Sequence, residues 1–166
     1  MKKITNVLVL IMSVSAYCQT ADDYYILGNN KCLLKDYKEA VNDYTKAIDL
    51  EPNFFDAYYS RADAKYNKKD YRDAVKDFTK AIEIDPQNRK AYYYRANTKS
   101  ILKDYNGAIE DYCKTIAIDS TYSPAFNARA ELKFKLGQKE SACADLNKAA
   151  ALGYPYYFDY IKEVCK

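Results

Sequence analysis

Apolar and polar residues along this chain follow a pattern that returns at a fixed interval. The stretch KDYKEAVNDYTKAIDLEP begins at Lys35, KDYRDAVKDFTKAIEIDP at Lys69, and KDYNGAIEDYCKTIAIDS at Lys103, each thirty-four residues after the previous one. A looser copy, GQKESACADLNKAAALGY, begins at Gly137. Self-similarity at this period indicates an array of one helical unit. We therefore expect four units, over residues 21–54, 55–88, 89–122 and 123–156.

Each unit carries two stretches with apolar residues at three-to-four spacing, which predicts two amphipathic helices. In the second unit the residues at this spacing are Tyr58, Arg61, Ala62, Lys65, Ala74, Phe78, Ala81 and Ile82. Proline disfavours helical geometry in the residue before it, so the second helices should end near Asp49 and Glu83, ahead of Pro52 and Pro86. The predicted fold class is all-α.

An aspartate stands between the two helices in each of the first three units, as an N-cap for the second helix. These aspartates are Asp36, Asp70 and Asp104. Glu39 and Asp73 follow the first two of them by three residues. That spacing predicts a capping box at each of these two helix starts.

Residues at fixed places in each unit resemble the tetratricopeptide repeat, which sets aromatic, small, alanine and proline residues along thirty-four positions. In the second unit they are Tyr58, Ala62, Tyr71, Ala74, Phe78, Ala81 and Pro86. The resemblance implies a solenoid of four helical hairpins. The last unit is the least regular, with Lys139 in place of a tyrosine, and PYYFDYIKEVCK is predicted to close the array with a capping helix over 157–166.

The first eighteen residues have the pattern of a secretory signal peptide. Lys2 and Lys3 precede an apolar stretch, and small residues follow it. Cleavage after Cys18 would leave Gln19 at the start of a domain over 19–166, with no permanent membrane span, in a periplasmic or extracellular compartment. The alternative is a lipid anchor on Cys18, although Tyr17 stands where a small residue is expected.

Composition argues against several function classes. The chain has no histidine, four glycines without a phosphate-binding loop, and no cysteine pairs at metal-ligand spacing, so neither a catalytic site, a metal site nor a cofactor is expected. A net charge of +3 is too small to indicate nucleic acid as a partner. Nineteen tyrosines and no tryptophan favour many half-exposed aromatic surfaces.

The resemblance implies a concave groove lined by positions 2, 5, 6, 9 and 12 of each unit, and this groove is expected to bind an extended peptide. The groove residues are Tyr25, Asn29, Tyr59, Asp63, Tyr66, Lys90, Tyr93, Tyr94, Asn97 and Glu131. The alternative is that the tyrosines only cover the helix pairs.

Some family members grip a C-terminal carboxylate with lysines, asparagines and an arginine. Here Asn29 and Lys90 match that set, but Tyr25, Ser60 and Tyr94 replace its other members. This chain is therefore not expected to form the carboxylate clamp.

A ladder of arginines at position 7 accompanies a ladder of aspartates at position 23. The arginines are Arg61, Arg95 and Arg129, and the aspartates are Asp43, Asp77, Asp111 and Asp145. The first unit has Leu27 in place of arginine and has no preceding unit. That count predicts pairs across unit boundaries: Asp43 with Arg61, Asp77 with Arg95, and Asp111 with Arg129. The alternative role of the arginines is to bind a ligand.

Cys143 and Cys165 are expected to form a disulfide. Each lies eleven residues from Tyr154, so antiparallel neighbouring helices joined by the turn at Gly153 to Pro155 would bring both to one level. Cys32 and Cys113 lie too far apart to pair. The alternative is that Cys143 and Cys165 touch but stay reduced.

Together these features predict a non-enzymatic scaffold that binds a peptide or a segment of a protein partner in its groove. A lipid-anchored envelope assembly factor of the same fold is the first alternative. An enzyme of unknown type is the second.

Overall fold

Eight α-helices form the described part of the computed structural model, which comprises residues 19–154 and 165. They are α2 (Ala21–Leu33), α3 (Tyr37–Leu50), α4 (Phe55–Asn67), α5 (Tyr71–Ile84), α6 (Arg89–Ile101), α7 (Tyr105–Ile118), α8 (Ser123–Lys135) and α9 (Lys139–Ala151). No strand occurs among these residues, so the chain is an all-α repeat solenoid. The predicted signal peptide, Cys18 and the predicted capping helix, except Cys165, lie outside the described residues.

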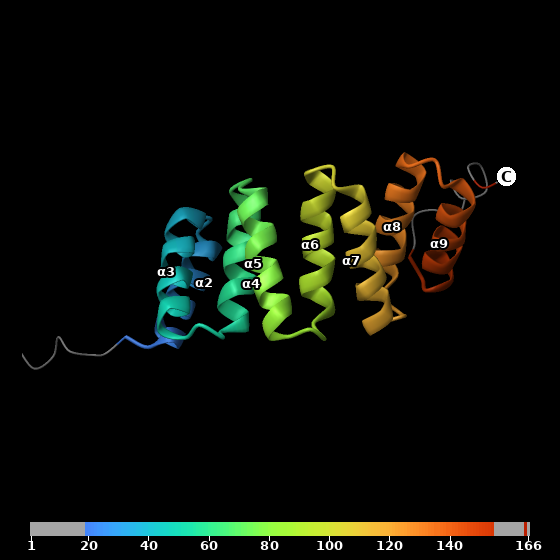
Figure 1. Cartoon of the computed structure of the whole chain (residues 1–166). Helices are drawn as coiled ribbons and strands as arrows, with labels where there is room; N and C mark the ends of the chain where they lie inside the picture. Colours follow the sequence, from blue (N-terminus) through green and yellow to red (C-terminus); the bar gives the residue numbers. More distant parts are fainter. Residues whose placement is uncertain (1–18, 155–164, 166) are drawn as a thin grey trace, which may run out of the picture.

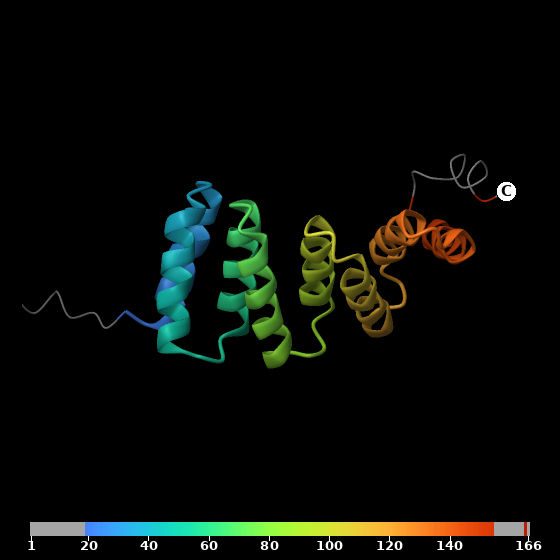
Figure 2. The ribbon, with the colours of Figure 1, turned by 45° about the horizontal axis from the view of Figure 1, so that its top comes forward.

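The helices are arranged as four hairpins in one row, with α2 and α3 at one end and α8 and α9 at the other (Figure 1). Each helix packs against the next one along the chain. The hairpins begin at the residues where the sequence repeat places its units: Ala21, Phe55, Arg89 and Ser123. Figure 2 shows α8 and α9 turned relative to α2 and α3, so the row twists along its length.

Within each hairpin, a small residue on the first helix faces a large one on the second. The small residues are Gly28, Ala62, Ala96 and Ala130, and the large ones are Tyr44, Phe78, Tyr112 and Leu146; all eight are buried. A Cβ on Gly28 would lie 2.6 Å from Cε1 of Tyr44. This close approach fixes the distance between the two helices.

The second helices of the first two units end one residue later than predicted, at Leu50 and Ile84. Glu51 and Asp85, which come directly before the prolines, have φ of −131° and −126° with ψ near 90°. This extended geometry is the one that a following proline imposes.

Each first helix ends in a turn whose hydrogen bonds explain why the predicted capping boxes are wrong. The amide of Asp36 donates to the Lys31 carbonyl at 2.9 Å, and the amide of Asp70 donates to the Lys65 carbonyl at 2.9 Å. These amides are therefore unavailable to Glu39 and Asp73. The Asp36 carboxylate still caps α3 through the Glu39 amide, and Asp104 caps α7, but Asp70 makes no side-chain cap and binds Lys68 instead.

Three lysines hold a left-handed backbone in these turns. Lys35, Lys69 and Lys103 have φ of 60°, 68° and 64°, and the fourth unit has Gly137 with φ of 75° at the same place. A side chain with a Cβ is strained in this region, whereas glycine is not. The fourth unit therefore has the favoured residue at a position where the first three do not.

The arginine and aspartate ladders pair within units, so the predicted pairing across unit boundaries is wrong. Nε of Arg61 lies 2.8 Å from Asp77, and Nε of Arg95 lies 2.8 Å from Asp111. Arg129 pairs with Asp145 in the same way. Each guanidinium donates two parallel hydrogen bonds to its carboxylate, which is the strongest geometry for this pair.

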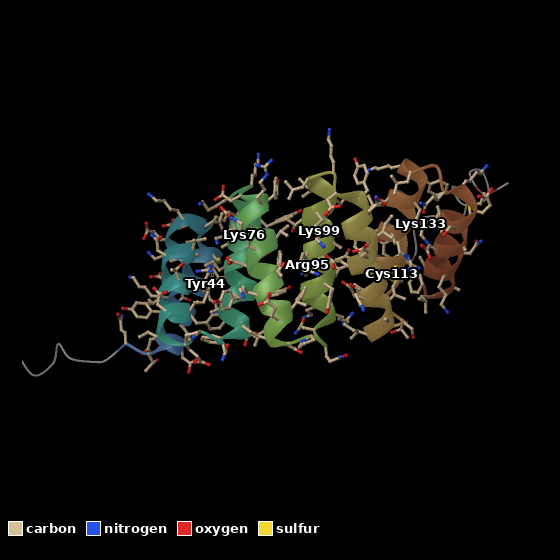
Figure 3. The ribbon with its side chains drawn as sticks, in the orientation of Figure 1. Tyr44, Lys76, Arg95, Lys99, Cys113 and Lys133 are labelled. Atoms are coloured by element: carbon tan, nitrogen blue, oxygen red, sulfur yellow. A yellow bond between two sulfur atoms is a disulfide. The ribbon has the colours of Figure 1, made fainter. Side chains whose placement is uncertain are left out.

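A lysine one turn after each arginine binds the same carboxylate. These lysines are Lys65, Lys99 and Lys133, with N–O distances of 2.7 to 2.8 Å. Figure 3 labels Arg95 and Lys99 on α6. Each of these three aspartates is buried and receives two cations, so its charge is fully compensated.

The third nitrogen of each arginine, Nη1, reaches the preceding unit. Nη1 of Arg61 donates to Thr45 Oγ1 at 3.0 Å, Nη1 of Arg95 donates to Thr79 Oγ1 at 3.0 Å, and Nη1 of Arg129 lies 3.1 Å from Cys113 Sγ. Among the described residues no unit precedes the first one, which has Leu27 in place of the arginine. Its aspartate, Asp43, is present, so the change to leucine follows the missing threonine-type partner and not the aspartate.

A disulfide joins Cys143 of α9 to Cys165, the pair that the sequence favours, with a Cα–Cα distance of 5.6 Å. Cys165 packs against the cluster of Ala130, Ala142 and Leu146. The end of the chain is thereby fastened to the last hairpin. Cys32 and Cys113 are free thiols.

We predict that Arg95 couples to Asp111 and not to Asp77. Arg95→Ala should lower the free energy of unfolding by about 2 to 3 kcal/mol, because the buried Asp111 carboxylate keeps Lys99 but loses the two parallel hydrogen bonds from the guanidinium. The loss should shrink when Asp111 is already alanine and remain whole when Asp77 is alanine. Urea unfolding of the three single variants and the two double variants measures this, and equal coupling to both aspartates would contradict the assignment.

We also predict that Lys69→Gly raises the free energy of unfolding by about 1 kcal/mol, because glycine removes the strain of the left-handed backbone. Lys68→Gly is the matched control, since Lys68 has a right-handed backbone with φ of −74° and should lose stability on the same change. Thermal unfolding distinguishes the two variants. A lower melting temperature for Lys69→Gly would refute the strain argument.

Candidate functional site

The first helices α2, α4, α6 and α8 provide the positions predicted to line a groove, and the side that they form is called the first-helix face below. A hollow of about 350 Å³ lies on this face between three consecutive units. Its lining is Tyr66, Tyr93, Asn97, Ser100, Ile101, Tyr112, Pro124, Asn127, Ala128, Glu131, Leu132, Lys135 and Tyr154. The residues come mainly from α4, α6 and α8, so stacking of the units creates the hollow.

The fourth unit departs from the others at position 5, which contributes to this hollow. The first three units have Tyr25, Tyr59 and Tyr93 there, whereas the fourth has Asn127. Asn127 lines the hollow together with Tyr93 of the preceding unit.

Four predicted groove residues meet in this hollow: Tyr66, Tyr93, Asn97 and Glu131. Asn97 accepts a hydrogen bond of 2.6 Å from the hydroxyl of Tyr112, a second-helix residue beneath the face. Glu131 accepts a hydrogen bond of 2.9 Å from the side-chain amide of Asn127. The hollow is thus built from aromatic rings and hydrogen-bond acceptors.

Predicted tyrosines outside the hollow form an aromatic row that leads toward it. The ring centroids of Tyr59 and Tyr94 are 6.0 Å apart, and those of Tyr94 and Tyr93 are 5.6 Å apart. Tyr93 also contacts Tyr122 at 5.2 Å. Tyr94 is 39% exposed, so part of this row is available to a ligand.

The remaining predicted groove residues are not brought to the hollow. Tyr25 lies between Tyr44 and Phe54, and Asn29 accepts a hydrogen bond of 2.8 Å from the Tyr44 hydroxyl. Lys90 lines a different hollow with Asp85 and Asp119, at the turns between units. Asp63 lies half-buried on α4, where it accepts from Asn67.

Burial shifts the titration of several groups on this face. It raises the pKa of Tyr59, Tyr93 and Tyr112 above the ordinary tyrosine value. It also raises the pKa of the Asp63 carboxyl. The phenols therefore stay neutral and present aromatic surface together with hydroxyl groups.

Sequence reasoning missed several lining residues, among them Ser100, Tyr112, Pro124, Asn127, Ala128 and Tyr154. Four of these occupy groove positions of their units, so the register alone could have identified Ser100, Pro124, Asn127 and Ala128. Tyr112 belongs to a second helix, and no groove position would have indicated it.

Two larger hollows, of about 510 and 490 Å³, lie at the turns between units. Their lining includes Pro52, Lys80 and Glu83 in one and Gln87 and Asp119 in the other. Fewer residues line these two hollows, and no aromatic row leads to them. The smaller hollow on the first-helix face is therefore the better candidate for a binding site. Among the described residues no group of side chains could hold a metal ion, and no helix could cross a membrane.

Comparison with known families gives three matches, all to tetratricopeptide repeats. A model named Tetratricopeptide repeat matches residues 55–88, a second of that name matches 78–110, and one named TPR repeat matches 21–69. Together they span residues 21–110, more than half of the 166 residues. No curated protein sequence matches the chain.

Solved structures share the fold. The crystal structure of MamA has a TM-score of 0.80 at 20% identity, covering 85% of this chain and 82% of that one. MamA 41-end from Desulfovibrio magneticus RS-1 has a TM-score of 0.77 at 20% identity, with coverage of 84% and 79%. The first TPR of Spaghetti (RPAP3), bound to the HSP90 peptide SRMEEVD, has a TM-score of 0.69 at 25% identity, with coverage of 72% and 94%.

Proposed function

The chain belongs to the tetratricopeptide repeat family, and on that premise we propose that it is a non-enzymatic scaffold that binds an extended segment of a protein partner along its first-helix face. The observation that carries this proposal is the hollow to which α4, α6 and α8 all contribute. Its rings would cover apolar side chains of the segment, and its amides would bond the segment's backbone.

The RPAP3 repeat domain, whose structure holds an HSP90 peptide, supports a peptide as ligand for this fold. The residues of this chain favour a different mode from the carboxylate clamp. Asn29 is engaged by Tyr44, Tyr25 packs between two rings, and Lys90 lines another hollow. The proposed contacts therefore depend on the aromatic row and the hollow beside it.

We expect Tyr93→Ala to weaken peptide binding by about fivefold or more, because aromatic anchors at the centre of an interface carry much of its binding energy. Peptides would be selected from a phage-displayed library of random linear sequences on the immobilised chain, and their affinity measured by fluorescence anisotropy. Tyr92→Ala is the matched control, because Tyr92 lies on the same helix beside Arg95 and does not line the hollow.

Circular dichroism would verify that both variants keep their helices. Equal weakening by the two substitutions, or failure to select any peptide, would contradict binding at the hollow. A loss confined to Tyr93→Ala would support it.

We further propose that the chain is exported. The lysines and apolar stretch at the start of the chain support this, as does the disulfide between Cys143 and Cys165, since disulfides persist in oxidising compartments.

Mass spectrometry of the chain from its native host should give a mature N-terminus at Gln19. Alkylation without reductant should label only Cys32 and Cys113, because the other two cysteines are bonded to each other. A chain that begins at an acylated Cys18 would establish the lipid-anchored alternative. A chain that retains Met1 would contradict export.

A further inference from the structure

One buried side-chain oxygen in the described part of the chain has no hydrogen-bond partner: Oδ1 of Asn127, a residue that lines the hollow. Asn127 is 6% exposed. The other buried polar residues are satisfied, since Asp77, Asp111 and Asp145 bind cations, and Thr98 and Thr115 donate to backbone carbonyls. A native protein keeps few unpaired buried acceptors, so this one requires an explanation.

The orientation of the Asn127 amide is fixed by its neighbour. The amide nitrogen donates to Glu131 Oε1 at 2.9 Å, four residues later on α8. If the amide were reversed, its oxygen would face a carboxylate, which repels it. The carbonyl oxygen is therefore the atom left without a donor, and a ligand in the hollow would have to supply that donor.

The charge beside this acceptor is negative. Glu131 is exposed at the edge of the hollow and forms no ion pair within the described residues. Lys135 also lines the hollow, but its Nζ lies over the ring of Tyr105, 5.6 Å from the centroid. The Glu131 carboxylate is therefore available to a cation from outside.

Negative charge also predominates at the groove positions along the first-helix face. Although the chain has a net charge of +3, the groove positions of its four units contain four carboxylates and one lysine. These are Asp22, Asp56, Asp63, Glu131 and Lys90. The rings of Tyr66, Tyr93 and Tyr112 complete the wall, and aromatic faces attract cations.

We propose that the hollow receives a basic side chain, lysine or arginine, from the bound protein segment. The cationic group donates to Asn127 Oδ1 and to the Glu131 carboxylate, while its aliphatic stem lies against the tyrosine rings. This inference rests on the proposed peptide binding and names the residue type that the site selects. A peptide carboxylate would meet two acceptors here, while the nearby Lys135 ammonium lies over the Tyr105 ring, so a carboxylate is disfavoured at this position.

The peptide selection tests the inference separately from the proposed function. We expect the selected peptides to be enriched in lysine or arginine at one position. Replacing that residue by norleucine or citrulline, which keeps the stem and removes the charge, should weaken binding about tenfold. Peptides that bind without any basic preference would overturn the inference and leave the scaffold function standing, whereas a library that yields no peptide would overturn the scaffold function itself.

Two substitutions test whether the Glu131 carboxylate is the group that binds the basic side chain. Glu131→Gln should weaken binding of the basic peptide about tenfold and leave the norleucine peptide unaffected. Glu140→Gln is the matched control, because Glu140 lies on α9 away from the hollow. Equal loss in both variants would show a general charge effect and would overturn the site.

Asn127→Leu gives an independent readout. The change removes the unpaired acceptor at similar volume, so the melting temperature should stay the same or rise while the basic peptide binds more weakly. Unchanged binding with a lower melting temperature would show that Asn127 has only a structural role.

Discussion

The arginine at position 7 of each of the last three units is the interaction on which the array depends. It uses two nitrogens on the aspartate of its own hairpin and a third on the hairpin before it. One side chain therefore ties the two helices of a unit together and also fastens that unit to the preceding one. Alanines packed without exposure set how close the helices lie, but apolar contact has no direction. The guanidinium supplies that direction, because its planar fork accepts few arrangements of its partners.

This geometry leaves the first helices with a free side. Arginine and lysine occupy positions 7 and 11 and face the second helix, so positions 5, 6 and 9 take no part in these ion pairs. In the first three units, tyrosines, amides and acids occupy most of positions 5, 6 and 9. Rigid stacking then gives the first-helix face a fixed spacing, which preorganises a surface for an extended ligand without any loop.

The fold could be predicted because every unit repeats the helical spacing of apolar residues and a small residue opposite a large one. The first two units also have a proline shortly after the second helix. The pairing of Arg95 with Asp111 could not be predicted. Counting arginines and aspartates showed that the first unit differed, but counts do not distinguish an aspartate partner from a threonine partner, and Thr79 proved to be the contact across the boundary. The capping boxes failed for a related reason: the amides of Asp36 and Asp70 were already committed to the preceding turn. Both errors concern which of several polar atoms meet, and periodicity contains no information about that.

The candidate site, too, could be predicted only in part from the sequence. The sequence register located Tyr93, Asn97 and Glu131, because these positions recur in each unit. It did not indicate that the side-chain oxygen of Asn127 would lack a hydrogen-bond partner. A repeat array shows its specific chemistry where a unit departs from the others, since the shared residues maintain the stack and are satisfied within it. Asn127 is such a departure. Beside it on α8 lies the carboxylate of Glu131, which forms no ion pair with any described residue. We propose that the irregularity of the fourth unit reflects the choice of ligand as well as its place near the end of the row.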